Sequence, residues 1–495
     1  MSLIKNSVIL GAANLVQKTV GMLRSVIIAR YFGTGGYLDC FFVALIPVNL
    51  LKMVVGTSMA ELLIPEYVKK KEQQKELFTA LFLGGLIIGF LTFIFLFLSA
   101  PLVVDRIGAG FSPEKKLLSV KLLKALSVLV TAYISNNILR ALAIAKGRFY
   151  LYSLSNFVGS ALLLVVILFY PTYGEGVLPA SLLIGEFAVM FLLIAFGLPQ
   201  LRIRRGIMEN VSVLKDKAGA LLALVAIVGL ERINPVVDSY FASHLGGGAI
   251  AILNYADSIY SSIMDVIAGA TVSVLYPRIS EIQDNGEFQE FLSRIINNVI
   301  FVFIPVTAFV IFFSKEIIIL LYQRGNFTAE DSVATSGALS FYALGMIFYQ
   351  IRLILARRFY AVNERKKVIY VTLLSIASNG LLNYILIRFF GLQGIAFSTS
   401  FVQVITCSIM LLMTGKEHLS YIGLIYFLKN IVVASALLFL VRSFIIDIVP
   451  GPFYNLAAGS AIFLSLWYFV CMKLSMVPDE ISAFVRNSTI KVRRA

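Results

Sequence analysis

Long apolar segments recur along the whole chain, and they restrict its fold more than any other feature. Runs of about 20 apolar residues, bounded by charges or by Gly and Pro, predict about fourteen helices. Hydrophobic residues make up 59% of the 495 residues and charged residues only 14%, against about 25% in soluble globular domains. Because the bilayer core offers no water to peptide groups, such segments cross it as helices. The sequence therefore predicts an all-α integral membrane protein.

Lys and Arg are distributed unequally between alternate connections of these helices. The basic residues of the connections divide into 25 on one side and 7 on the other. Because cytoplasmic loops collect Lys and Arg, we expect both termini in the cytoplasm, and the net charge of +15 needs no nucleic-acid partner. No small-x-small cleavage site precedes Lys18, so we expect a retained first helix. The predicted spans are 7–32, 38–64, 77–104, 117–146, 150–170, 176–199, 217–243, 249–276, 289–314, 331–361, 366–389, 391–414, 421–446 and 453–474.

Two segments of the chain are similar to each other and predict two lobes. Beginning at Tyr31 and at His244, each has a Gly-rich turn, an acidic residue (Asp39 or Asp257), an apolar helix, a proline and a charged loop. Both copies begin after an odd number of helices, which indicates parallel repeats of the kind found in some transporters. We predict an N-lobe over residues 1–205 with helices 1–6, a C-lobe over 206–415 with helices 7–12, and helices 13–14 with a basic tail over 416–495.

Some basic residues fall inside the predicted spans, and those near mid-depth are Lys18, Arg24, Lys52 and Arg232. A charge at the bilayer centre costs about 2.5 to 3.5 kcal/mol, so these side chains are expected to avoid lipid. On a helical wheel Lys18 and Arg24 lie about 60° to either side of Gly21 and about 9 Å apart along the axis. Gly21 therefore leaves space between the two charged groups.

Two interpretations of these bases remain open. They either snorkel or pair with acids, or they line a water-filled cavity. Three bases within two consecutive helices favour a cavity between the lobes that holds an anion. Lys and Arg bind phosphate through charge-assisted hydrogen bonds, so we expect a phosphate-bearing ligand. The acids available for pairing are Asp39, Glu61, Glu231 and Asp238.

The sequence lacks the motifs of several enzyme and metal-binding classes. It contains no G-x-x-x-x-G-K-[ST], no H-x-x-x-H, no D-D-x-x-D cluster and no nucleophile elbow. Cys40, Cys407 and Cys471 are far apart, and His244 and His418 have no metal-ligand spacing. We predict a protein that is not an enzyme and needs no cofactor other than an ion. Its energy source is then an ion gradient, the membrane potential or another protein.

Several motifs resemble those of a known transporter family. They are "GMLRSVIIARYFGTGGYLDCFFVALIPVNLLK", "ILNYADSIY", "VLYPRIS" and "LLYQRGNFTAEDSVATSGALSFYALGMI". Together they resemble the lipid II flippases of the MurJ type, in the multidrug/oligosaccharidyl-lipid/polysaccharide exporter superfamily, across helices 1–12. The resemblance implies a fourteen-helix transporter of the bacterial inner membrane. It would move a polyprenyl-diphosphate-linked glycan to the outer leaflet by alternating access, with helices 13 and 14 forming a groove for the lipid tail.

The resemblance also implies which residues bind substrate. The family's essential cationic positions fall on Lys18, Arg24 and Lys52, and Asp39 matches an acidic residue at the start of helix 2. The family usually has arginine at the first and third positions, and lysine lacks its bidentate fork. Gly21, because of its place on the helical wheel, and Arg232, because of its charge within a span, complete the predicted substrate site.

Other substrates remain open because one motif departs from the family. After "NYAD" the family has an arginine and often a glutamate, where this chain has Ser258 and Ser261. A flippase for an exopolysaccharide or O-antigen unit is therefore an alternative. An ion-coupled multidrug exporter is less favoured, because a site for organic cations needs carboxylates and the excess here is basic. A membrane scaffold needs no buried bases, and a glycan enzyme needs acid/base pairs that we do not find.

A sodium site is implied by the resemblance to family members that bind sodium in the second lobe. The matching residues are Asp238, Asn379, Asn383 and Thr399, with a carbonyl near Ile395. Asn379 and Asn383 share a helix face, and oxygen ligands suit a hard cation. The alternative is that the asparagines form hydrogen bonds between helices. The expected partners are a lipid-linked diphosphate glycan and membrane lipids, and we expect a monomer.

Overall fold

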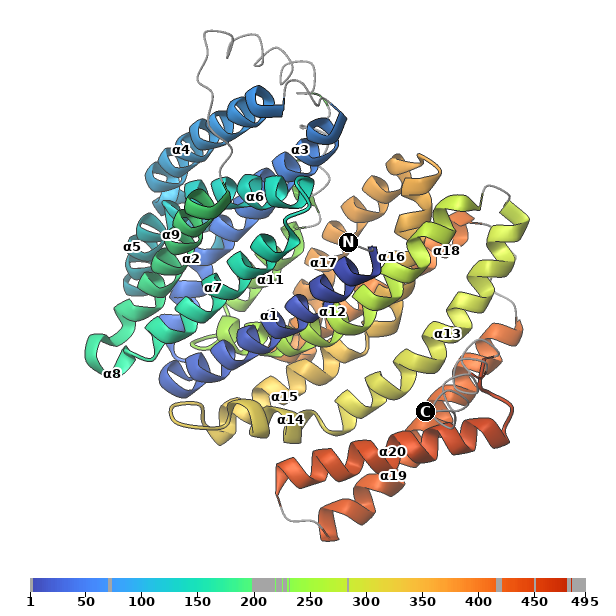
Figure 1. Ribbon diagram of the computed structural model, residues 1–495. Helices are drawn as coiled ribbons and strands as arrows, with labels where there is room; N and C mark the ends of the chain where they lie inside the picture. Colours follow the sequence, from blue (N-terminus) through green and yellow to red (C-terminus); the bar gives the residue numbers. More distant parts are fainter. Residues whose placement is uncertain are drawn as a thin grey trace. The chain divides into compact units, whose positions relative to one another are not determined.

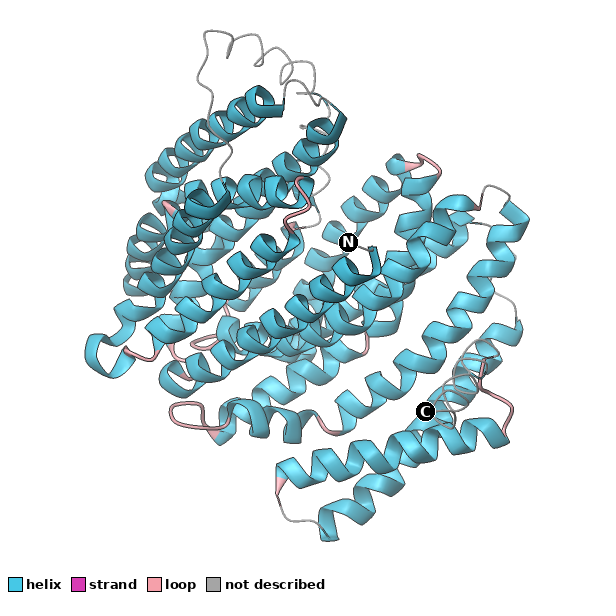
Figure 2. Ribbon diagram, viewed as in Figure 1, coloured by secondary structure: helices cyan, strands magenta, loops and turns pink. Residues whose placement is uncertain are grey.

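The computed structural model consists of helices joined by turns (Figures 1 and 2). It describes residues 3–69, 74–197, 219, 225, 229–230, 232–282, 285–414, 421–448, 451–478 and 482. No residue in these ranges forms a β-strand. The predicted all-α class is confirmed.

The first of two compact units contains Met1–Ala251 and Arg324–Phe327. α6 is its central helix, because it packs against α3, α4, η1 and α9, while α7 packs against α1 and α9. α6 accordingly buries residues on several faces. The elements of this unit are α1 Leu3–Phe32, α2 Gly36–Leu51, the π-helix η1 Lys52–Thr57, α3 Ser58–Lys69, α4 Gln74–Ile107, α5 Pro113–Ser127, α6 Leu129–Ala145, α7 Phe149–Ile167, α8 Tyr170–Tyr173, the 3₁₀-helix η3 Gly174–Gly176, α9 Val177–Gly197 and α11 Ile233–Ala242.

The second unit contains Ile252–Gln323 and Thr328–Ala495. α17 packs along α18, which also contacts α15 and α16, while α13 packs against α19. α19 and α20 form a hairpin, shown in red in Figure 1. Its helices are α12 Ala249–Glu281, whose first residues belong to the first unit, α13 Asn285–Phe312, α14 Ser314–Tyr322, α15 Ala329–Ala343, α16 Met346–Ala361, α17 Arg365–Phe390, α18 Leu392–Thr414, α19 Tyr421–Ile448 and α20 Pro452–Lys473.

Within the described residues, ten helical segments are long and apolar enough to cross a membrane. The number becomes eleven if α15 and α16, which meet at 43°, form one broken span. α1 and α12, with 30 and 33 residues, are also long enough to cross a bilayer. Most of the predicted span 217–243 lies outside the described residues, which contain its last part as α11. The count of fourteen therefore stays a prediction.

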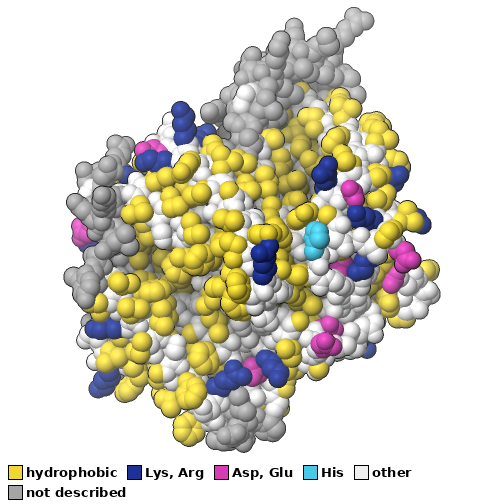
Figure 3. All heavy atoms as spheres, turned by 180° about the vertical axis from the view of Figure 1, so that it is seen from behind, with side chains coloured by type: hydrophobic (Ala, Val, Ile, Leu, Met, Phe, Trp, Pro, Cys, Tyr) yellow, Lys and Arg dark blue, Asp and Glu magenta, His cyan; other side chains and the backbone are white. Residues whose placement is uncertain are grey.

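Large apolar side chains are exposed along several helices. Phe95 and Leu98 of α4, Phe191 of α9 and Phe444 of α19 have exposed fractions of 63% to 74%. Hydrophobic side chains cover much of the face drawn in Figure 3. Exposed apolar surface of this extent is unfavourable in water but is expected against lipid tails. The structure thus supports the predicted multi-pass membrane protein.

The predicted span 38–64 is interrupted by the π-helix η1, which begins at Lys52. π-Turns within α-helices are rare and occur frequently at functional sites. η1 packs closely on α6, because a Cβ atom at Gly56 would lie 2.4 Å from Nδ2 of Asn137. The interruption therefore lies at one of the predicted site residues.

The predicted lobe boundary at residues 205 and 206 lies outside the described residues, so the two lobes stay a prediction. α11 and the first residues of α12 belong to the first compact unit. The two acids of the repeat differ in position, since Asp39 lies in the first turn of α2 and Asp257 lies eight residues after the start of α12.

Replacing Gly394 by alanine should destabilise the α17–α18 hairpin. A Cβ atom there would lie 2.4 Å from the backbone oxygen of Leu386, which cannot move as a side chain can. We expect the unfolding free energy to fall by about 1 to 3 kcal/mol and thermal unfolding of the detergent-solubilised protein to shift downward. Gly176→Ala is the control, because nothing lies within 4 Å of its Cβ position. Equal melting temperatures for the two variants would contradict this prediction.

Candidate functional site

The predicted bases of α1 border open space in the first unit. A Cβ atom at Gly21 would have nothing within 4 Å. Lys18 is exposed and Arg24 is half-buried, one turn to either side of this position. α1 therefore presents two cations on either side of a position where a Cβ atom would meet no neighbouring atom.

Lys52 lies over an aromatic ring of the neighbouring helix α6. Its Nζ is 3.9 Å from the centroid of the Tyr133 ring, and its side chain is half-buried. Among the described residues no group accepts a hydrogen bond from Lys52, and no acid lies within ion-pair distance of it. An ammonium group has three N–H donors. Lys52 is thus held by a cation–π contact while its donors remain unused.

α6 presents further polar residues at helical spacing. Tyr133, Asn136 and Arg140 are three and four residues apart and so share a face. Nδ2 of Asn136 donates to Oε2 of Glu186 on α9 at 2.8 Å and to the Glu186 backbone oxygen at 3.0 Å. Nε of Arg140 donates to Oγ of Ser155 on α7 at 3.2 Å. The face of α6 that contacts Lys52 therefore also carries the base Arg140 and, through Asn136, binds the acid Glu186 of α9.

The charges of these helices act on one another. Glu186, Arg140 and Arg24 interact electrostatically with the Lys52 ammonium. The same three groups interact electrostatically with Tyr133. We call Arg24, Lys52, Arg140 and Glu186 the basic cluster. Its three cations outnumber its one acid, so the cluster is suited to an anion.

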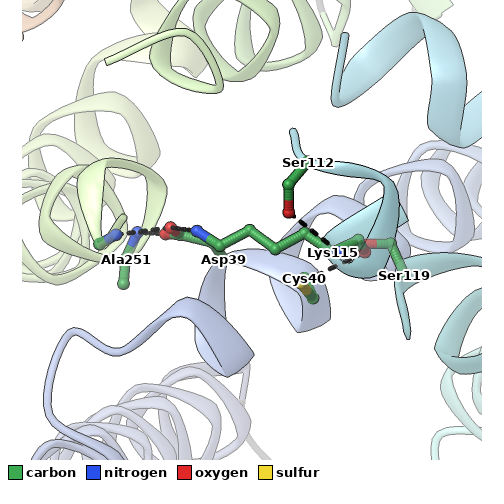
Figure 4. Close-up of polar contacts among 7 residues, drawn as sticks. Asp39, Cys40, Ser112, Lys115, Ser119 and Ala251 are labelled. Atoms are coloured by element: carbon green, nitrogen blue, oxygen red, sulfur yellow. Dashed lines mark hydrogen bonds and ion pairs between the residues drawn. The ribbon is translucent and has the colours of Figure 1, made fainter. Parts of the chain in front are cut away.

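Asp39 lies elsewhere, at the N-terminus of α12 (Figure 4). Its fully buried carboxylate accepts hydrogen bonds from the backbone N–H groups of Gly248 at 2.6 Å and Ala251 at 3.0 Å. Nζ of Lys115 lies 3.6 Å from the same carboxylate. The first N–H groups of a helix have no partner within the helix, and the helix dipole favours a negative charge there. Asp39 therefore acts as a cap for α12 and does not contact the basic cluster.

Several turns of the first unit lie near this cap. They are 33–35, 108–112, 243–248 and 324–327. Oγ of Ser243 accepts a hydrogen bond from the Gly110 N–H at 3.0 Å, and the Asn326 N–H donates to the Arg30 backbone oxygen at 2.9 Å. Gly248 has φ +89°, and a Cβ atom on it would lie 2.5 Å from the Thr34 oxygen. Only glycine fits such a close approach at positive φ.

Arg232 is exposed at the start of α11, and the structure does not bring it to the basic cluster. Ser258 and Ser261 lie together on α12, where Oγ of Ser261 donates to the Ser258 backbone oxygen at 3.4 Å. The three positions therefore give no direct support for a role in binding.

The residues of the predicted sodium site lie in both units. Asp238 is half-buried in α11 of the first unit. In the second unit Asn379 and Asn383 are buried on α17, and Oγ of Ser398 on α18 contacts both Oδ1 atoms, the first at 3.0 Å. Oγ1 of Thr399 donates to the Ile395 backbone oxygen at 3.2 Å. The second unit thus supplies a group of oxygens on two packed helices.

Long apolar helices with cations among them are typical of a membrane transporter. A solved structure described as an inward-facing multidrug resistance MATE transporter of the MOP superfamily matches with a TM-score of 0.63 at 14% identity, over 80% of this chain and 93% of that one. A solved structure described as "Lipid II flippase MurJ, inward closed conformation" matches with a TM-score of 0.82 at 24% identity, over 94% of this chain and 99% of that one.

The family follows from the sequence comparisons. The family model "Lipid II flippase MurJ" matches residues 28–460. The probable lipid II flippase MurJ of Buchnera aphidicola subsp. Acyrthosiphon pisum is 25% identical over 472 residues, 89% of this chain and 90% of that protein. The chain belongs to the lipid II flippase MurJ family, and the predicted resemblance is confirmed.

The sequence reasoning missed Tyr133, Asn136 and Glu186. The signal that could have found them is the acid in "LLIGEFAVM", because an ionisable residue inside a span is rare and marks a functional site by default. Considering acids inside spans together with bases would have included Glu186.

Asp39→Asn should loosen the first turn of α12. The substitution removes the negative charge and the Lys115 ion pair, and it leaves one oxygen for two N–H donors. We expect amide hydrogen exchange at residues 248–251 to become about tenfold faster, the equivalent of about 1.4 kcal/mol, by mass spectrometry. Asp105→Asn is the control, since Asp105 is exposed and pairs with Lys116 away from α12. Unchanged exchange at 248–251 would rule out the cap.

Proposed function

We propose that this protein is a flippase that moves lipid II from the inner to the outer leaflet of the bacterial inner membrane by alternating access. Family membership supports the substrate and the transport class. The observation that carries the site is the Lys52 ammonium, which lies on the Tyr133 ring with unused donors beside the charge of Arg24.

Diphosphate recognition follows from the chemistry of these cations. Lys52 donates to a phosphate oxygen through a charge-assisted hydrogen bond. Arg24 adds a planar guanidinium, which can donate two parallel N–H groups to phosphate oxygens. The open space at Gly21 admits the headgroup next to α1, with exposed Lys18 at its edge. Partial burial lowers the local dielectric and strengthens these interactions. The sugar moves with the headgroup, and the lipid tail stays in the membrane.

Asp39 has a role other than binding. Its contacts with Gly248, Ala251 and Lys115 all lie within the first compact unit, where they hold the start of α12. Asp39 therefore supports transport by stabilising this unit.

The orientation, oligomeric state and energy source belong to the same proposal. The excess of Lys and Arg in alternate connections supports cytoplasmic termini. We propose a monomeric transporter without enzymatic activity, driven by the membrane potential or an ion gradient.

Lys52→Gln should reduce flipping of lipid II in reconstituted vesicles by at least about tenfold, because a charge-assisted donor at the headgroup is worth about 1.5 to 3 kcal/mol. Lys52→Arg should retain flipping. Lys121→Gln is the control, since it removes the same charge from an exposed position of α5. An unchanged rate in Lys52→Gln would refute the site. Vesicles with an undecaprenyl-diphosphate-linked exopolysaccharide or O-antigen unit distinguish the alternative substrates.

We further propose that sodium binds in the second unit at Asn379, Asn383, Thr399 and the Ile395 carbonyl, whereas the predicted ligand Asp238 belongs to the first unit. The oxygens of Asn379 and Asn383 converge on one side of α17, and the Thr399 hydroxyl lies against the Ile395 carbonyl. A donor set made only of oxygens suits a hard cation.

Asn383→Asp should strengthen sodium binding, because it adds a carboxylate to a site whose other ligands in the second unit are uncharged oxygens. We expect the apparent sodium affinity to rise about tenfold, or about 1.4 kcal/mol, in isothermal titration of the purified protein. Asn363→Asp is the control, since it makes the same change in the turn between α16 and α17. Equal sodium titrations for both variants and the unmodified protein would reject this ion site.

A further inference from the structure

Glu186 is an acid of the membrane interior placed among cations. It is half-buried in the middle of α9, a helix of 21 residues that is otherwise apolar. A charged side chain at such depth is costly unless it is paired or serves a function. Its side chain accepts a hydrogen bond from Asn136, and no base lies within ion-pair distance of it among the described residues.

The geometry brings Glu186 close to Lys52 without joining them. Lys52 contacts Tyr133, Tyr133 lies one turn from Asn136 on α6, and Asn136 donates to Glu186. The contacts that lead from the ammonium to the carboxylate therefore pass through two residues one turn apart on α6. The Lys52 ammonium and the Glu186 carboxylate therefore attract each other without a direct contact. The ammonium donors stay available to a ligand.

The charges of the basic cluster leave a positive surplus for an anionic headgroup. Arg24, Lys52 and Arg140 carry three positive charges and Glu186 one negative charge, so the net charge is +2. Each phosphate of a diphosphate diester has one ionised oxygen at neutral pH. Glu186 therefore brings the charge of the cluster closer to that of the headgroup than its three cations alone would.

We propose that Glu186 is a positioning residue of the transport site, the internal counter-anion that moderates the hold of Lys52 and its neighbouring cations on the lipid diphosphate. This inference rests on the proposed function, because it assumes that a diphosphate binds at the basic cluster. A transported ligand must bind well enough to enter and weakly enough to leave. The fixed carboxylate sets that balance, and Asn136 keeps it in place.

Glu186→Gln tests the proposal because glutamine keeps an acceptor for Asn136 and removes the charge. The probe is undecaprenyl diphosphate, which has the two phosphates but no sugar and one more ionisable oxygen than the diester, and its binding to the purified full-length protein is measured in nanodiscs. We expect its Kd to fall about three- to tenfold, and lipid II flipping at saturating substrate to slow because release is slower. Asp105→Asn is the matched control for the loss of one acid.

A compensating pair separates this role from a structural one. Lys52→Gln should weaken binding of undecaprenyl diphosphate, and adding Glu186→Gln restores the net charge to that of the unmodified cluster. We expect the double variant to regain most of the lost affinity. Damage to packing by either substitution would not produce such a recovery.

Unchanged or weaker binding by folded Glu186→Gln, or no recovery in the double variant, would overturn the proposal. A different result would overturn the proposed function: the unmodified protein binds undecaprenyl diphosphate but does not flip lipid II. Tighter binding by Glu186→Gln in that case would leave the counter-anion standing for another diphosphate-linked substrate.

Discussion

The structure depends on keeping charged groups inside a helix bundle that faces lipid. Lys52 is held against Tyr133 by a cation–π contact, and Glu186 is held by Asn136, so neither charge is exposed to the apolar surroundings without support. α6 provides both supports and is also the central packing helix of the first unit. Stability and recognition therefore use the same helix: its apolar faces bury against α3, α4 and α9, and its polar face arranges the cations.

Two acids of the first unit have different functions because their surroundings differ. Asp39 is fully buried at a helix N-terminus, with two backbone donors and Lys115, and its interactions are complete. Glu186 has one side-chain partner and lies among cations that it does not touch. The first acid stabilises a conformation, while the second adjusts the electrostatic potential at the place where we propose that the headgroup binds.

The helices could be predicted from the sequence because apolar length is a local signal. The predicted spans 77–104, 366–389 and 453–474 correspond to α4, α17 and α20 with ends that differ by a few residues. The breaks within 38–64 and 331–361 could not be predicted, since a π-turn and a bend depend on packing with other helices. The partners of Asp39 are also nonlocal, because Gly248 lies 209 residues away. Glu186 was not predicted for another reason. Attraction to phosphate points to Lys and Arg, and it gives no reason to expect an acid among them.

The π-helix at Lys52–Thr57 adds chain to the middle of one span without rotating the helix that follows. Its wider winding accommodates one residue more than an α-helix would over the same rise. Deleting a single residue there would therefore restore α-helical winding and leave Ser58 and Met59 on their buried face. The change would be confined to the winding around Lys52, so the extra residue determines the local position of this side chain and not the course of the span.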